Sequence, residues 1–192
     1  MIRGLAPPCQ PAIFRAMNSA ALPSVLVVMG VSGSGKTTVA AMLAGRLGWE
    51  FGDADDFHPA ANIRKMQGGA PLTDADRAPW LAAMAAWIVA TRAVGRHGVL
   101  ACSALKRAYR QVLIDGHDDV RLVYLQGDRA LIGGRQAARH NHFMPASLVD
   151  SQFATLEEPG PEEHAVTISV VPHPPAIVAA IVAAVGARPV FA

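Results

Sequence analysis

Apolar runs and amphipathic stretches alternate along most of this chain. Five short runs, most of them apolar throughout, predict strands buried on both faces of a sheet, at residues 25–29, 49–52, 98–101, 121–125 and 166–171. Helical patterns and helix-start or helix-stop signals mark the stretches between them, at residues 36–47, 62–66, 74–94, 105–114, 129–138, 148–156 and 176–185. Strands that alternate with helices predict a parallel sheet covered on both faces, so the predicted fold class is α/β.

The long stretch at 74–94 shows the helical pattern most clearly. Thr73 or Asp74 can cap its beginning. Its large side chains recur on one helical face, namely Trp80, Leu81, Met84, Trp87, Ile88 and Thr91. This spacing indicates a helix packed on the sheet, with its tryptophans in the core.

Composition narrows the class of protein. The chain has 192 residues, a formal net charge of +2 and 52% hydrophobic residues, which suits one domain with a real core. Charged and aromatic residues are too few for a nucleic-acid groove, and no apolar run reaches the length of a membrane span. Cys9 and Cys102 have neither disulfide nor zinc spacing, so we expect a cytoplasmic protein. We expect residues 1–22 to be a disordered extension and residues 23–192 to form the single domain.

Residues 30–37 carry the motif that says most about chemistry. They match G-x-x-x-x-G-K-[ST] after an apolar strand and at the start of a helix. In such a phosphate-binding loop (P-loop), backbone N–H groups surround the β-phosphate, the lysine bridges the β- and γ-phosphates and the hydroxyl binds Mg²⁺. We therefore expect ATP and Mg²⁺ as cofactors, Lys36 as a catalytic residue and Thr37 as a metal ligand. The other nucleotide-binding residues expected here are Gly30, Ser32, Gly33, Ser34, Gly35 and Thr38.

Motifs elsewhere in the chain indicate which class of P-loop protein it is. It lacks the N-K-x-D motif with which GTPases read guanine, and it lacks an ABC-type signature. A small kinase is therefore the favoured interpretation. A regulatory module that holds a nucleotide without any small acceptor is the alternative from another class.

An acidic cluster follows the second predicted strand. Asp53, Asp55 and Asp56 lie where the carboxyl ends of parallel strands place ligands. Carboxylates there can hold Mg²⁺ through water, or orient and deprotonate an attacking hydroxyl. An acidic turn that merely caps the next helix is the alternative.

Lysine is rare in this chain and its placement is informative. Of 17 basic residues only three are lysines, Lys36, Lys65 and Lys106, and each lies in a loop-to-helix region. Because lysine is a compact point charge on a flexible stem, these positions suggest a site for an anionic ligand. Arg110 is four residues beyond Lys106 and so lies on the same helical face. Solvated helix faces are the alternative for Lys65 and Lys106.

A basic stretch without any acid lies between Asp128 and Asp150. Arg135 and Arg139 are spaced to face one phosphate, and Gly133-Gly134 would permit hinging. We predict a lid at about residues 128–146 that covers ATP, with Arg135 as a catalytic residue and Arg139 as a further nucleotide contact. An exposed basic helix is the alternative.

Several motifs together resemble those of the gluconate kinases, a group of P-loop small-molecule kinases. The resemblance covers about residues 24–186, nearly the whole chain. It is carried by residues 30–37, 55–59, 62–66, 71–81, 102–106, 109–110 and 152–159. Departures are Gly133-Gly134 and His140-Asn141 in the predicted lid, where larger or charged residues are expected, and the extension at residues 1–20.

The resemblance implies ATP-dependent phosphorylation of D-gluconate on its terminal hydroxyl, giving 6-phosphogluconate. It also implies a homodimer and a three-layer fold like that of nucleoside monophosphate and shikimate kinases, with strand order 2-3-1-4-5. It assigns a water-mediated Mg²⁺ role to Asp53 and the acceptor hydroxyl to Asp55. The residues that it implies for holding the polyol and carboxylate are His58, Lys65, Lys106 and Arg110. Shikimate or another small hydroxy acid is the alternative substrate.

Overall fold

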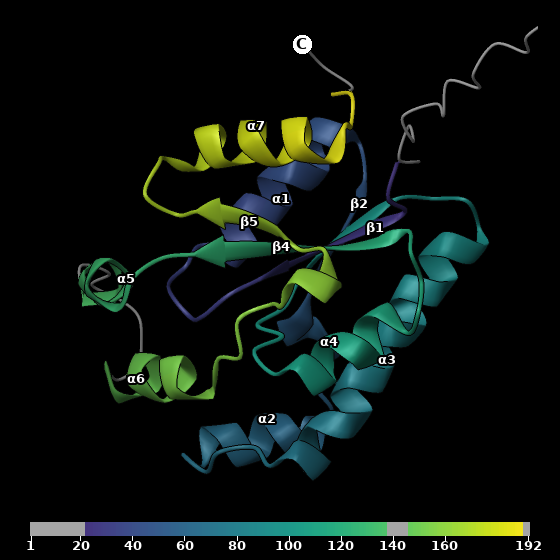
Figure 1. The fold of residues 1–192 in the computed structure, drawn as a ribbon. Helices are drawn as coiled ribbons and strands as arrows, with labels where there is room; N and C mark the ends of the chain where they lie inside the picture. The colour runs from purple at the N-terminus through teal and green to yellow at the C-terminus, as the bar shows by residue number, and fades with distance from the viewer. Residues whose placement is uncertain (1–21, 138–145, 190–192) are drawn as a thin grey trace, which may run out of the picture.

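A five-stranded parallel sheet forms the centre of the molecule in the computed structural model, which describes residues 22–137 and 146–189 (Figure 1). The strands lie in the order β2-β3-β1-β4-β5, which confirms the predicted order. Their bounds are β1 Val25–Met29, β2 Glu50–Asp53, β3 Gly98–Ala101, β4 Val120–Gln126 and β5 Val166–Ser169. All four pairings are parallel. The carboxyl ends of the strands therefore share one edge of the sheet.

Helices cover both faces of this sheet and make the three layers. Helices α1 (Lys36–Leu47) and α7 (Pro174–Val185) lie on one face, and α3 (Asp74–Ala93) and α4 (Arg107–Ile114) on the other (Figure 1). Two apolar cores result, and β1 serves both. Leu26 and Val28 belong to the core under α1 and α7, whereas Val25, Val27 and Met29 belong to the core under α3. A strand buried on both faces explains the unbroken apolar run in the sequence.

The long helix α3 packs as its pattern predicts. Trp80, Leu81, Met84, Ile88 and Thr91 are buried. Trp87 is partly buried and lies against a glycine of β3, because a Cβ at Gly98 would come within 2.7 Å of the indole. Both predicted tryptophan positions therefore belong to the packing of α3 on the sheet.

Some predicted boundaries were wrong near the carboxyl edge. Strand β2 is followed by a 3₁₀ turn, η1 Ala54–Phe57, and α2 runs over Ala60–Gln67, longer than the predicted 62–66. Helix α4 begins at Arg107 because Ala104 has a φ of 43° and Lys106 is extended. Strand β5 ends at Ser169, two residues before the predicted end, and a second 3₁₀ turn, η2 Pro161–Glu163, precedes it.

The predicted lid region is only partly described. Helix α5 spans Arg129–Ala137 and α6 spans Ala146–Thr155, which confirms two helices near the predicted bounds. Arg139, His140 and His142 lie outside the described residues, as do residues 1–21 of the extension predicted at 1–22. Within residues 22–137 and 146–189, no helix combines the length and hydropathy needed to span a bilayer.

Candidate active site

The P-loop joins β1 to α1 at the carboxyl edge of the sheet, and its glycines fit a close backbone turn. Gly30 has a φ of 146°, and a Cβ there would lie 2.9 Å from the carbonyl oxygen of Leu125 and 2.9 Å from Ser34 Oγ. Gly33 and Gly35 have φ values of 85° and 90°, the left-handed region that favours glycine. The N-cap residue of α1 is Gly35, which has no side chain to cap the helix. The first N–H groups of α1 are thus open to an anion.

Polar atoms inside this loop also fit a phosphate group. Ser34 Oγ is buried and has no hydrogen-bond partner among the described residues. Lys36 folds back on the loop, and its Nζ donates to the carbonyl oxygen of Val31 at 3.0 Å. Thr37 and Thr38 are exposed in the first turn of α1. A buried orphan hydroxyl normally finds a partner, and phosphate oxygens would supply one.

The acidic cluster lies next to the P-loop lysine. Asp53 ends β2 beside Ala101 of β3, and its Oδ1 accepts a hydrogen bond from the Asp55 N–H at 3.1 Å. Burial lowers the pKa of Lys36, while the nearby carboxylates of Asp55 and Asp53 act in the opposite direction. The side chain of Asp55 is exposed. The structure therefore brings three predicted site residues, Lys36, Asp53 and Asp55, to one place.

The described side chains of the site offer few ligands for a metal ion. No group of three or more His, Cys, Asp or Glu side chains in the described part of the chain could hold a metal ion. A Thr37 hydroxyl and an Asp53 carboxylate fit a magnesium ion that takes its other ligands from phosphates and water, which is how Mg²⁺ is usually held beside nucleotides.

His58 lies against the acidic cluster in a partly buried position. Its ring stacks on Trp80 with centroids 4.7 Å apart and planes 1° from parallel. Trp80 is itself fixed, because its Nε1 donates to the carbonyl oxygen of Ala54 at 2.7 Å. Burial lowers the pKa of His58, and its Nδ1 is buried without a partner among the described residues. A neutral ring with an open nitrogen can exchange hydrogen bonds with a hydroxylated ligand.

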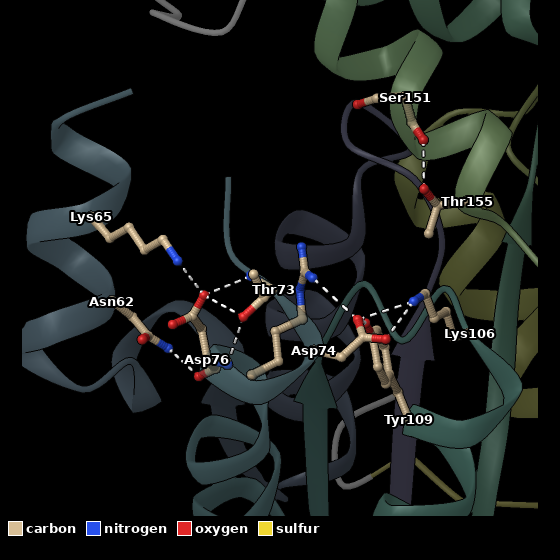
Figure 2. Close-up of polar contacts among 10 residues, drawn as sticks. Asn62, Lys65, Thr73, Asp74, Asp76, Lys106, Tyr109, Ser151 and Thr155 are labelled. Atoms are coloured by element: carbon tan, nitrogen blue, oxygen red, sulfur yellow. Dashed lines mark hydrogen bonds and ion pairs between the residues drawn. The ribbon is translucent and has the colours of Figure 1, made fainter. Parts of the chain in front are cut away.

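Both predicted acceptor-side lysines are ion-paired with the start of α3 (Figure 2). Lys65 of α2 lies 2.5 Å from Asp76 Oδ2, and Lys106 lies 2.7 Å from Asp74 Oδ2. The Tyr109 hydroxyl donates to Asp74 Oδ1 at 2.5 Å. The structure therefore gathers residues of α2, the α3 N-terminus and the α4 N-terminus.

The electrostatics of these pairs keep them charged. The hydrogen bonds from Lys106 and Tyr109 lower the pKa of Asp74, and the bond to Asp74 raises the pKa of Lys106. Hydrogen bonds from Lys65 and Thr73 lower the pKa of Asp76 further. Asp74, Asp76 and Lys106 thus remain ionised at neutral pH.

Arg110 corrects a prediction. Its guanidinium is fully buried and pairs with both carboxylate oxygens of Glu163, at 2.6 and 2.7 Å. Its Nη1 also donates to the carbonyl oxygens of Ala104, Leu105 and Glu157. Because its donors are directed at protein acceptors, Arg110 fastens α4 to the chain around η2 and does not face a substrate. Helical spacing from Lys106 could not reveal Glu163, which is 53 residues away in sequence.

The lid arginines are only partly placed. Arg135 lies in the last turn of α5, where its Nη2 donates to the carbonyl oxygen of Val171 at 3.3 Å. Arg139 lies outside the described residues. The predicted contact of these two arginines with one phosphate therefore stays a prediction.

Several residues of this region were missed from the sequence. Asp74 and Tyr109 lie against Lys106, and Arg77 pairs with Asp74, although all three fall inside the runs that carry the family resemblance. Gln152 of α6 reaches the P-loop, where its Oε1 accepts from the Ser32 N–H at 2.6 Å. Membership of a recognisable motif was the available signal, since helical spacing alone gave none.

Comparisons with known proteins agree with this geometry. A family model described as an AAA domain matches residues 25–159. A gluconokinase of Gluconobacter oxydans (strain 621H) is 51% identical over 152 residues, or 79% of this chain and 85% of that protein. The crystal structure of a gluconokinase from Sinorhizobium meliloti 1021 matches with a TM-score of 0.77 and 41% identity, over 86% of this chain and 93% of that one. A shikimate kinase from Aquifex aeolicus shares the fold, with a TM-score of 0.56 and 14% identity over 84% of this chain and 96% of its own.

Proposed function

Since this chain belongs to the gluconokinase family, we propose that its P-loop and the carboxylates after β2 move a phosphoryl group from ATP to the terminal hydroxyl of D-gluconate. The protein is a kinase with an alcohol acceptor, and gluconate is its substrate. The products of the proposed reaction are 6-phosphogluconate and ADP. The observation that carries the residue assignment is the strand register, in which Asp53 at the end of β2 lies level with Ala101 of β3 and Val28 of β1, just before the P-loop. Asp53, Asp55 and Lys36 therefore share one edge of the sheet.

The donor side is assigned to the P-loop. The open N–H groups at the start of α1, together with Ser34 Oγ, bind the phosphates of ATP. Gly30, Gly33 and Gly35 allow the backbone to approach those phosphates, and Ser32 and Thr38 flank them. Lys36 exchanges its bond to the Val31 carbonyl for oxygens of the β- and γ-phosphates.

Thr37 and Asp53 hold Mg²⁺ in this proposal, Asp53 through a water molecule. When bound, the ion neutralises charge on the phosphates and fixes their orientation. Both residues lie at the carboxyl edge of the sheet, one at the start of α1 and one at the end of β2. The magnesium position thus needs no further protein ligand.

The acceptor side is assigned to Asp55, His58, Lys65 and Lys106. Asp55 is exposed, so its carboxylate can orient the terminal hydroxyl and accept its proton. The open nitrogen of His58 and the remaining N–H groups of Lys65 and Lys106 bind hydroxyls of the polyol chain. Arg135 and Arg139 stabilise charge on the phosphoryl group in transfer.

An ADP-release assay tests the assignment of roles. We expect ADP release to require gluconate in the unaltered enzyme and to be abolished by Lys36→Ala. Asp55→Asn lowers kcat by roughly 10²–10⁴-fold while ATP binding, measured by calorimetry, is retained, because the lost group acts on the acceptor proton. Asp56→Asn, at the adjacent exposed acid, is the matched control and leaves kcat within about twofold. Equal rates for Asp55→Asn and Asp56→Asn would refute the base assignment.

Two further properties are proposed from family membership. We propose a cytoplasmic enzyme that works as a homodimer. Light scattering of the purified full chain tests the proposed dimer. We expect a molar mass near twice the 20.1 kDa of one chain. A mass near 20.1 kDa at micromolar concentration would overturn it.

A further inference from the structure

The cations on the acceptor side differ in how far protein groups already satisfy them. Arg110 is enclosed by Glu163 and three carbonyl oxygens. Lys65 and Lys106 are each within 2.7 Å of a carboxylate oxygen. Arg77 is the exception among these four, because among the described residues its carboxylate neighbour is Asp74 at 3.6 Å, beyond hydrogen-bond distance.

The guanidinium of Arg77 is therefore an unused donor group. Its side chain makes no hydrogen bond to any described residue, and it is only 31% exposed. Arginine presents several N–H groups in a planar fork, and a partly buried fork without acceptors loses water without gaining partners. Such a group is poised for a ligand that supplies two oxygen atoms in one plane.

The surroundings of Arg77 favour an anion. Arg77 lies 6.0 Å and Lys106 Nζ 5.5 Å from the centre of the Tyr109 ring, so both cations meet at one aromatic residue. In the part of the chain that the structure describes, Asp74 is the carboxylate that pairs with both of them. The cluster of Arg77, Lys106, Asp74 and Tyr109 thus has one positive charge in excess, whereas the Lys65–Asp76 and Arg110–Glu163 pairs are neutral.

The cluster also lies within reach of the reacting end of the site. His58 connects the two, because its ring stacks on Trp80, which lies three residues after Arg77 on the same face of α3. The charges of Asp55 and Arg77 both act on the pKa of His58, which agrees with this placement. A six-carbon hydroxy acid carries its carboxylate and its terminal hydroxyl at opposite ends. A hydroxyl at Asp55 therefore directs the carboxylate away from the P-loop and toward Arg77.

We propose that Arg77 binds the carboxylate of gluconate through its planar fork, with Lys106 beside it, and so selects a sugar acid over a neutral polyol. The residue is a specificity determinant that rests on the proposed function. Asp74 is its positioning partner, since it lies against Arg77, Lys106 and Tyr109 at once. An arginine fork matches a carboxylate in a way that a lysine cannot.

The test compares two ligands that differ at one end. D-gluconate is the substrate, and D-glucitol, which has a CH₂OH group in place of the carboxylate, is a competing ligand at millimolar concentration. For Arg77→Gln we expect KM for gluconate to rise roughly tenfold to hundredfold, the range for a lost hydrogen bond to a charged group. We expect kcat to stay within about threefold and the inhibition constant of D-glucitol to stay unchanged.

Two further variants complete the design. Arg77→Lys keeps the charge and loses the fork, so it raises KM for gluconate by a smaller factor and serves if Arg77→Gln does not fold. Arg46→Gln removes an exposed arginine of α1 and is the matched charge control, with no change in either constant.

Each contrary result has a distinct meaning. An unchanged KM for gluconate in Arg77→Gln, or equal weakening of gluconate and D-glucitol, overturns the proposal. A loss of kcat with an unchanged KM for gluconate would place Arg77 on the phosphoryl group and would overturn it as well. Failure of the underlying function is seen separately, as absence of gluconate-dependent ADP release in the unaltered enzyme.

Discussion

His58 shows how a single side chain acquires chemistry from its surroundings. In the sequence it is one of seven histidines, and only its place in the family motif distinguishes it. The structure stacks it on Trp80 and buries one ring nitrogen without a partner. No pattern of spacing could predict this, because the burial depends on Trp80 of α3 folding back against η1.

The pH dependence of stability tests the state of His58. Burial holds the folded pKa below the ordinary value of 6.5, so the unfolded chain binds more protons in the window just below pH 6.5. The free energy of unfolding therefore falls as pH falls through this window, and the loss is complete below the folded pKa. Urea unfolding at pH 7.5, 6.5 and 5.5 should show a steeper loss in the unaltered protein than in His58→Gln. His164→Gln, at an exposed histidine, should keep the full slope; equal slopes for His58→Gln and the unaltered protein would contradict the burial of a neutral ring.

At the scale of elements, the N-terminus of α3 organises the acceptor side. Thr73 and Asp76 form a capping box, with the Thr73 N–H donating to Asp76 Oδ2 at 2.6 Å and the Asp76 N–H donating to Thr73 Oγ1 at 3.2 Å. The same Asp76 carboxylate accepts a hydrogen bond from Lys65. The backbone carbonyl oxygen of Asp76 accepts another from Asn62 Nδ2 at 2.8 Å (Figure 2). Asp76 therefore both caps the N-terminus of α3 and holds α2 against it.

Removing this cap should weaken the helix and the site together. Thr73→Ala is expected to cost about 1 kcal/mol in the free energy of unfolding, the usual value for a lost N-cap. Because Asp76 loses its Thr73 hydroxyl partner, Lys65 is held less firmly and KM for gluconate rises. Urea unfolding and steady-state kinetics measure the two effects. Thr73→Ser retains the hydroxyl and should behave like the unaltered protein, and an equal loss in both variants would argue against the cap.

Elements were predictable from the sequence where local pattern decides them. Alternation of apolar strands with helices predicted every strand and the layers, and the sequence offered Thr73 and Asp74 as caps, of which the structure selects Thr73. The start of α4 was not predictable, because the φ of 43° at Ala104 belongs to a buried bend whose carbonyl accepts from Arg110. Strand order came from the family resemblance and not from periodicity.

At the scale of the whole molecule, Arg110 joins segments that are distant in sequence. Its ion pair with Glu163 connects α4 to η2, and its hydrogen bond to the Glu157 carbonyl reaches the segment that follows α6. The pair is buried, with side-chain exposures of 1% and 9%. Helical spacing put Arg110 on the face of Lys106, and only tertiary packing turned it inward.

A structural role for Arg110 has a clear signature. Arg110→Met leaves Glu163 and three carbonyl oxygens without their donor, so we expect a loss of about 3–5 kcal/mol in the free energy of unfolding. KM for gluconate and for ATP should stay within about twofold where the variant is folded, because no ligand contact is removed. Arg107→Met, which breaks the exposed pair with Glu162, is the control and should cost about 0–1 kcal/mol. A raised KM for gluconate with unchanged stability would instead support the assignment of Arg110 to substrate binding.

The proposed reaction is one chemical event, the transfer of a phosphoryl group from ATP to the terminal hydroxyl of gluconate. Phosphorus and proton NMR of the reaction mixture follows that event directly, by locating the phosphate ester and counting it against ADP. We expect one ester on the terminal carbon for each ADP formed, and neither product without gluconate. Inorganic phosphate in place of the ester, or an ester on another carbon, would contradict it.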